Sequence, residues 1–220
     1  MKWYEKYLSV YGKPYADVSA EVMDGIRNRL RTLQSDEPLV SVVVIAYNEE
    51  KHLPACPWSL SESVCEYPME IIGVNNDSAD RTADVFEASG IPYHTELQHS
   101  CGYARRCGLQ YSQGKYYICI DSDTMYPPGY VQAMTDALQR PGIVAVSSLW
   151  SYMPDEGHPW LGLKIYEFMR DTHLWMQSFK RPELSVRGLV FAYNADYGRK
   201  VGYRVDIIRG EDGSMALGLK

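Results

Sequence analysis

Four short runs of apolar residues recur along the middle of the chain, and the segments between them have helical periodicity. The runs are nearly continuous and rich in β-branched residues, which is typical of strands covered on both faces. They occupy residues 39–45, 70–74, 116–120 and 143–146, with helical segments at 79–89 and 102–112. This alternation predicts an α/β fold with a mostly parallel central sheet flanked by helices.

The residues before the first run follow a different pattern. Met23, Ile26, Leu30 and Leu33 recur at helical spacing, and Ser19 stands where it can cap the helix. We expect an N-terminal helical extension over residues 1–37, ended by Pro38, whose apolar stripe docks on the rest of the chain. A second unit then covers residues 38–220, with halves at 38–148 and 149–220.

A longer helix is expected late in the chain, between residues 160 and 179. One of its faces is rich in aromatic side chains, with Leu161, Ile165, Phe168, Thr172, Trp175 and Phe179 on it. Packing against the protein core is the favoured interpretation of this face. Contact with a membrane surface or with an acceptor is the alternative.

Composition narrows the class of protein. The chain has 220 residues and a net charge of −6, and no run of Lys or Arg exceeds two residues, so nucleic acid is not an expected partner. No apolar stretch approaches the ~20 residues that span a bilayer. The five cysteines are odd in number and include no C-x-x-C pair, which favours reduced thiols and a cytoplasmic location.

Three of the predicted strands end in polar groups. These are Tyr47-Asn48-Glu49-Glu50, Asn75-Asn76-Asp77 and Asp121-Ser122-Asp123. Ligands of open α/β sheets bind outside the carboxyl ends of the strands, so these segments are expected to form one binding site. The chain contains no G-x-G-x-x-G, and residues 108–115 do not fit a P-loop, which excludes a Rossmann dehydrogenase and a P-loop NTPase.

Carboxylates at a site of this kind point to a divalent cation. Asp121 and Asp123 would repel a diphosphate unless a metal ion lay between them and the phosphates. Hard oxygen ligands suit Mg²⁺ or Mn²⁺. An Asp-x-Asp pair is also common in ordinary turns. Its position at the end of an apolar strand, beside two other polar strand ends, favours metal binding.

At this point the motifs carry a resemblance to a known family. The chain resembles the family 2 glycosyltransferases, which have the GT-A fold, and especially their bacterial members. The resemblance covers residues 38–219 and rests on motifs at 42–50, 75–82, 102–108, 121–123 and 210–212.

The resemblance implies roles for individual residues. The nucleotide-sugar donor would be bound by Ala46, Tyr47, Asn48, Glu49, Asn76, Arg105, Asp121 and Ser122. Arg105 would face the diphosphate or shape the pocket floor. Asp121 would approach the ribose, and Asp123, with Asp121, would hold Mn²⁺ or Mg²⁺. Asp212 would be the catalytic base, with Glu211 beside it.

The chain departs from the family pattern at two positions. Asn76 replaces the more usual acidic residue, and because an amide can both donate and accept, the choice of base stays open. Arg106 stands where the family commonly has Asn. Either it serves the phosphates together with Arg105, or it is a surface residue.

The expected function is a metal-dependent, inverting glycosyltransferase with a UDP- or GDP-type donor. A hydroxyl attacking an anomeric carbon must lose its proton, and a carboxylate such as that of Asp212 can accept it. The acceptor would be a glycan or a lipid-linked glycan, at or near the inner face of the membrane. The alternatives are a nucleotidyltransferase and a non-catalytic module that binds sugar nucleotides. The donor sugar, the linkage and the oligomeric state are left open.

Overall fold

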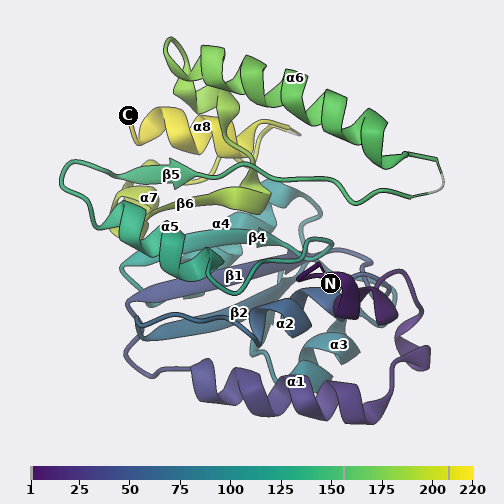
Figure 1. Cartoon of the computed structure of the whole chain (residues 1–220). Helices are drawn as coiled ribbons and strands as arrows, with labels where there is room; N and C mark the ends of the chain where they lie inside the picture. The colour runs from purple at the N-terminus through teal and green to yellow at the C-terminus, as the bar shows by residue number, and fades with distance from the viewer. Residues whose placement is uncertain (1, 156, 208) are drawn as a thin grey trace.

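The computed structural model describes residues 2–155, 157–207 and 209–220 of the chain (Figure 1). Short 3-10 helices are labelled η. The elements, in chain order, are η1 (Glu5–Ser9), η2 (Tyr15–Asp17), α1 (Ala20–Leu33), β1 (Val40–Ala46), α2 (Ala55–Leu60), β2 (Met69–Asn75), α3 (Thr82–Ser89), β3 (Tyr93–Thr95), α4 (Cys101–Tyr111), β4 (Tyr116–Asp121), α5 (Tyr130–Leu138), β5 (Ala145–Ser147), α6 (Trp160–Ser178), η3 (Pro182–Ser185), η4 (Gly188–Val190), β6 (Phe191–Asn194), α7 (Ala195–Val201) and α8 (Glu211–Gly218).

The strands form one mixed sheet in the order β3-β2-β1-β4-β6-β5. Strand β1 pairs in parallel with both β2 and β4, and β2 pairs in parallel with β3. Strand β6 runs antiparallel to its neighbours β4 and β5. The chain therefore leaves β1 first toward β2 and later toward β4. A reversal of this kind opens a crevice at the carboxyl ends of β1 and β4, where ligands bind in open sheets.

The predicted strands are present, and two further strands were not predicted. The runs at 39–45, 70–74 and 116–120 correspond to β1, β2 and β4, and the run at 143–146 becomes the shorter β5. Strands β3 and β6 are only three and four residues long. Segments of that length carry no usable periodicity, and their neighbours in the sheet decide their conformation.

Helices cover both faces of the sheet. One face packs against apolar side chains of α1, α2, α3 and α5, and the other against those of α4 and α8. Figure 1 shows α5 in front of the sheet and α4 behind it. Helix α4 lies very close to β1, because a Cβ on Gly108 would overlap the side chain of Val43. This close approach brings the first turn of α4 to the carboxyl edge of the sheet.

The N-terminal helix docks within the chain, as predicted. The Ser19 Oγ accepts a hydrogen bond from the Val22 N–H (3.3 Å) and caps α1, which ends at Leu33, before Pro38. Met23, Ile26 and Leu30 lie buried in the same core as strand β1. The residues ahead of α1 form two 3-10 turns rather than a long helix.

Helix α6 corrects one sequence-based expectation. Its aromatic face does not pack on the core: Leu161, Phe168 and Trp175 are 63%, 74% and 63% exposed. The side that faces the protein buries Glu167 and Leu174 instead. Periodicity located an apolar stripe on this helix correctly, but it could not tell which side of the helix faces the body.

Candidate functional site

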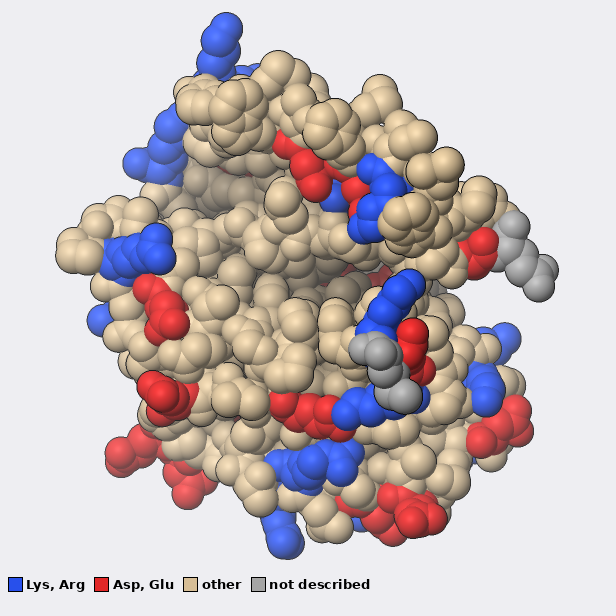
Figure 2. Space-filling view, in the orientation of Figure 1, with Lys and Arg blue, Asp and Glu red and all other residues tan. Residues whose placement is uncertain are grey.

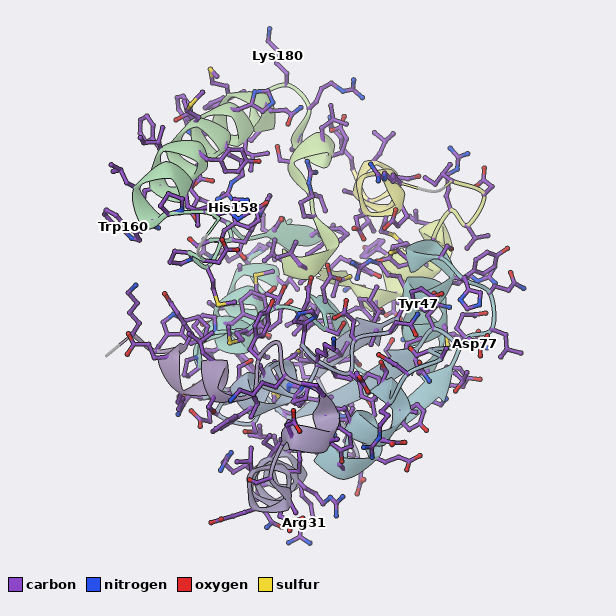
Figure 3. All side chains as sticks on the ribbon, turned by 90° about the vertical axis from the view of Figure 1, so that its right-hand side faces the viewer. Arg31, Tyr47, Asp77, His158, Trp160 and Lys180 are labelled. Carbon is purple, nitrogen blue, oxygen red and sulfur yellow. The ribbon has the colours of Figure 1, made fainter. Side chains whose placement is uncertain are left out.

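The polar strand ends form one pocket, as their positions predicted. A cavity of about 350 Å³ opens at the carboxyl edge of β1, β2 and β4, between the first turn of α4 and the start of α8. Figure 3 looks onto this edge, with Tyr47 and Asp77 on its right-hand side. All the predicted site residues except Asn48 line the cavity; the complete lining is Ile45, Ala46, Tyr47, Glu49, Asn76, Cys101, Ala104, Arg105, Asp121, Ser122, Asp123, Arg187, Gly188, Leu189, Glu211 and Asp212.

Asn48 holds two loops together instead of lining the pocket. Its backbone is in the left-handed region, with φ at 54°. Its N–H donates to Ser78 Oγ (3.0 Å), and its Oδ1 accepts from the Ala79 N–H (2.8 Å). The loop after β1 is thereby fixed against the loop after β2. Asn is among the few residues other than glycine that adopt this backbone conformation readily.

Glu49 is anchored on both sides. Its N–H donates to Thr82 Oγ1 (2.8 Å), and its carboxylate lies 2.7 Å from His52 Nδ1. Burial raises the pKa of Glu49 above its ordinary value, and the contact with His52 opposes that rise. The Tyr11 ring packs on His52, and the Tyr11 hydroxyl donates to the carbonyl oxygen of Asp123 (3.1 Å). The N-terminal segment therefore touches both the Glu49 and the Asp123 loops.

Arg105 is the centre of the site. Its side chain is only 3% exposed and lies between two carboxylates: Nη2 donates to Asp121 Oδ1 at 2.8 Å, and Nε lies 2.9 Å from Asp212 Oδ1. The second contact is an ion pair without hydrogen-bond alignment, because neither of its two atoms has a hydrogen-bond partner. Arg105 is therefore held at the wall of the pocket by two carboxylates from different elements.

Asp212 is a carboxylate with unusual basicity. Burial raises its pKa to about 6, although Arg105 opposes the rise; Glu211 and Asp121 add to it through repulsion. Gly188 lies directly against this group, and any Cβ there would overlap the Arg105 guanidinium and the Asp212 carboxylate. Only glycine fits at position 188 without displacing one of the two. The backbone of Gly188 therefore lies in direct contact with the charged groups of Arg105 and Asp212.

Asn76 has a defined hydrogen-bonding role. Its Nδ2 donates to the carbonyl oxygens of Glu96 (2.9 Å) and Gln98 (2.8 Å). Two carbonyl acceptors fix the orientation of the amide, since only its nitrogen can donate to them. Both N–H groups of Asn76 are therefore used inside the protein. Among the described residues no group donates to its Oδ1, which leaves this acceptor for a ligand.

Arg106 is a surface residue. It is exposed, and its guanidinium stacks over the Tyr103 ring at 4.7 Å. The sequence left open whether Arg106 lies beside Arg105 in the pocket. In the structure Arg105 lines the pocket and Arg106 does not.

Asp121 and Asp123 suit a hard divalent cation. Asp121 commits Oδ1 to Arg105, and its side chain stays 33% exposed. Asp123 is exposed, and its Oδ1 accepts a hydrogen bond from the Thr124 hydroxyl (3.1 Å). In the part of the chain that the structure describes, no three His, Cys, Asp or Glu side chains are grouped as metal ligands. One or two carboxylates with ligand phosphates and water are a common set for Mg²⁺, so these residues fit such an ion.

A second, larger cavity adjoins the first and was not foreseen. It measures about 870 Å³ and shares Asp121, Asp123 and Leu189 with the smaller pocket. Figure 2 shows this face of the molecule hollowed below helix α6, with uncharged side chains around most of the hollow. Aromatic side chains from distant parts of the chain line the cavity, namely Trp3, Tyr4, Tyr11, Tyr126, Tyr130, Trp150 and Tyr152.

Several lining residues carried no signal in the sequence. Arg187, Gly188 and Leu189 fall in an irregular segment, and nothing in their neighbours indicates that they close the pocket. Tyr11 lies in the N-terminal extension, outside the unit of residues 38–220 that was expected to contain the site. Tyr126 is buried, donates to the Leu189 carbonyl (2.8 Å) and accepts from the Asp121 N–H (3.1 Å). The contact between Tyr126 and Leu189 joins segments 63 residues apart, so no local pattern could indicate it.

Comparison with known sequences identifies a family. A sequence model described as glycosyl transferase family 2 matches residues 41–197. The chain is 32% identical over 105 residues to the putative glycosyltransferase EpsH of Bacillus subtilis, covering 45% of this chain and 30% of that protein. It is 29% identical over 106 residues to the uncharacterized glycosyltransferase RP339 of Rickettsia prowazekii, covering 47% and 33%. The chain thus spans about a third of the length of these curated relatives.

Comparison with solved structures identifies the fold. Glucosyl-3-phosphoglycerate synthase from Mycobacterium tuberculosis, in complex with UDP, has a TM-score of 0.60 at 21% identity and covers 90% of this chain and 71% of its own. The mannosyltransferase PcManGT from Pyrobaculum calidifontis, in complex with GDP-Man and Mn²⁺, has a TM-score of 0.63 at 17% identity and covers 90% and 59%. At these identities the likeness concerns the fold alone.

The buried position of Arg105 leads to a stability prediction. Arg105→Met would leave Asp121 and Asp212 without their cation, so we expect the free energy of unfolding to fall by about 3–5 kcal/mol. Arg106→Met, next in the chain but exposed, is the matched control and should change it by less than about 1 kcal/mol. Urea unfolding at neutral pH measures both. The Arg105→Met deficit should shrink as the pH is lowered toward about 6, because Asp212, without the cation that lowers its pKa, takes up a proton and no longer needs that cation.

Equal losses for Arg105→Met and Arg106→Met would contradict the bridging role of Arg105. So would a deficit in Arg105→Met that does not change with pH.

Proposed function

Because the chain belongs to glycosyl transferase family 2 and has the GT-A fold, we propose that it transfers a sugar from a nucleoside-diphosphate sugar to a hydroxyl acceptor. One observation carries the proposal. A single pocket brings the half-buried Asp121 and the exposed Asp123 close to the buried, basic carboxylate of Asp212, with Arg105 between Asp121 and Asp212. Such a site can bind a metal and its diphosphate next to a general base.

Asn76 limits the choice of donor base. Its remaining Oδ1 can accept a hydrogen bond from a ring N–H of the base. Uracil, thymine and guanine each have such an N–H on the ring, and cytosine does not. The proposal is a UDP- or GDP-type donor, with Ala46, Tyr47 and Glu49 around the nucleotide; Asn76 alone does not separate uracil from thymine. Related structures of this fold contain UDP and GDP-Man.

Asp121 and Asp123 would hold Mn²⁺ or Mg²⁺ together with the donor phosphates. A bound divalent ion supplies charge that stabilises the departing nucleoside diphosphate. The hydrogen bond from Arg105 holds the Asp121 side chain, and the hydrogen bond from the Tyr11 hydroxyl holds the Asp123 backbone, so both ends of the turn are fixed. The metal in the related mannosyltransferase is Mn²⁺.

Asp212 would act as the general base. The acceptor hydroxyl gives its proton to the Asp212 carboxylate as its oxygen attacks the anomeric carbon from the side opposite the leaving group. One displacement of this kind inverts the configuration and needs no covalent enzyme intermediate. A pKa of about 6 leaves Asp212 mostly ionised at neutral pH and more basic than an ordinary carboxylate. Glu211, beside it, helps to keep that pKa high.

The larger cavity would bind the acceptor. It meets the donor pocket at Asp121 and Asp123, so its ligand would reach the sugar next to the metal. Flat aromatic side chains such as Trp150 and Tyr152 suit the faces of sugar rings and the apolar parts of a lipid-linked glycan. Its wall includes Trp3 and Tyr4, which gives the N-terminal segment a part in acceptor binding. A role in polysaccharide or glycolipid synthesis follows from such an acceptor.

Nucleotide binding provides a direct test. UDP, GDP and TDP with Mn²⁺ should raise the thermal midpoint by mass action, whereas CDP should do so much less. Without Mn²⁺ the shifts should become small. Asp123→Ala should remove most of the Mn²⁺-dependent shift, and the control Asp24→Ala, on an exposed position of α1, should keep it. Differential scanning fluorimetry measures all of these.

Two results would overturn the donor assignment. One is an equal shift with CDP and UDP. The other is a UDP shift that is the same with and without Mn²⁺ and is unchanged in Asp123→Ala.

The raised pKa of Asp212 predicts how the rate depends on pH. The base acts only when ionised, so kcat/KM should rise about tenfold per pH unit below about 6 and level off above it. Nucleoside-diphosphate release between about pH 5 and about pH 8 measures this, with the thermal midpoint followed in parallel to exclude unfolding. A rate that stays constant from about pH 5 to about pH 7 would contradict Asp212 as the base.

A further inference from the structure

Helix α6 has its polar side toward the protein and its apolar side toward solvent. Most surface helices of globular proteins have the opposite arrangement. Figure 1 shows α6 along the outer edge of the molecule, beyond β5 and α8. The helix spans 19 residues, and the large apolar side chains that it exposes by more than half are Trp160, Leu161, Ile165, Tyr166, Phe168, Met169, Trp175 and Met176, followed by Phe179 just past its end.

Most of these side chains lie on a continuous stripe. At 100° per residue, Leu161, Ile165, Phe168 and Met169 fall on one side of the helix. Trp175, Met176 and Phe179 continue that side for two further turns. A continuous apolar surface of this length is unusual for an exposed helix and indicates a binding surface. We call it the α6 outer face.

Polar contacts on the side of α6 that faces the protein fix the rotation of the helix about its own axis. The Glu167 carboxylate accepts from the Tyr152 N–H (2.7 Å) and pairs with Lys164 (2.7 Å). The Arg170 guanidinium stacks over the Trp150 ring at 4.3 Å, donates to the Trp150 carbonyl and pairs with Asp171 (2.8 Å). These contacts fix the orientation of α6 against residues 150–152.

The same contacts determine which charges the helix shows to solvent. Both acidic side chains of α6, Glu167 and Asp171, are paired with cations on the inward side. Two cations follow the helix and are exposed: Lys180, and Arg181, which also pairs with the buried Glu183 carboxylate (3.2 Å). Figure 3 shows Lys180 pointing away from the body at one end of α6 and Trp160 at the other end. The α6 outer face is therefore apolar with a basic end and no acidic group.

We propose that the α6 outer face docks on the surface of an anionic lipid bilayer. No helix among the described residues is both long enough and apolar enough to cross a membrane, so the contact would lie in the plane of the interface. The Trp and Tyr rings suit the headgroup region, and basic residues are attracted to anionic lipids.

Docking there would place the larger cavity beside the bilayer. Trp150 and Tyr152, which hold α6 in its orientation, also line that cavity. If the proposed function holds, a lipid-linked acceptor could enter the cavity without leaving the membrane. The docking itself rests only on the α6 outer face and does not depend on the proposed transfer.

Sedimentation with vesicles tests the docking with the whole chain and no nucleotide. We expect binding to vesicles of phosphatidylcholine with phosphatidylglycerol, weaker binding to phosphatidylcholine alone, and weakening by added salt. Phe168→Asp combined with Trp175→Asp should lower the partition coefficient at least about tenfold. Val64→Asp combined with Leu97→Asp is the matched control, because these side chains are also highly exposed (69% and 70%) but lie elsewhere. The control should bind as the wild type does.

Three outcomes would overturn the proposal. The wild type could fail to bind anionic vesicles, or both double variants could bind equally well. Light scattering could also reveal a dimer without lipid that Phe168→Asp with Trp175→Asp dissociates, which would make a second copy the occupant. Nucleotide-induced thermal shifts of the same variants report separately on the donor site, so a failure of the proposed function would be distinguished from a failure of the docking.

Discussion

One buried guanidinium between two carboxylates organises the site. Arg105 comes from the second turn of α4, Asp121 ends strand β4, and Asp212 lies in the first turn of α8, so a single side chain joins three elements of the fold. Removing one member of a buried ion group leaves a charge without a partner in a poorly solvated place. The positions of the turn that carries Asp123 and of the helix that carries Asp212 therefore depend on the same residue.

This arrangement also explains why Asp212 differs from Asp121. The two carboxylates share one cation, and burial is the largest influence on Asp212, whose pKa rises to about 6. Asp121 is a third exposed and keeps the direct hydrogen bond from Arg105. One carboxylate is thus suited to accept a proton near neutral pH, and the other is suited to a metal. The absence of a side chain at Gly188 makes room for both contacts.

The sequence was informative where local pattern and chemistry coincide. Apolar runs followed directly by polar groups located β1, β2 and β4 and placed Tyr47, Asn76 and Asp121 at one edge, because parallel strands end on the same side. Features that depend on distant partners could not be foreseen. The depth of Arg105, the contact of Tyr11 with the Asp123 loop and the closure by Gly188 are of this kind. The aromatic face of α6 was located correctly but assigned to the wrong side, since periodicity contains no information about what the rest of the chain offers as a partner. The roles assigned to individual site residues, the domain boundaries and the cytoplasmic location stay predictions.

Sugar transfer in this pocket, with Asp212 as the base, requires an ionised carboxylate at position 212. The most direct measurement is the release of nucleoside diphosphate from a UDP- or GDP-sugar with Mn²⁺, for the wild type and for Asp212→Asn. Asp212→Asn should lower turnover at least about a hundredfold while the Mn²⁺-dependent thermal shift with UDP or GDP persists. Asp206→Asn, at an exposed aspartate paired with Arg204, should leave both unchanged. Equal turnover in Asp212→Asn and the wild type would contradict the account.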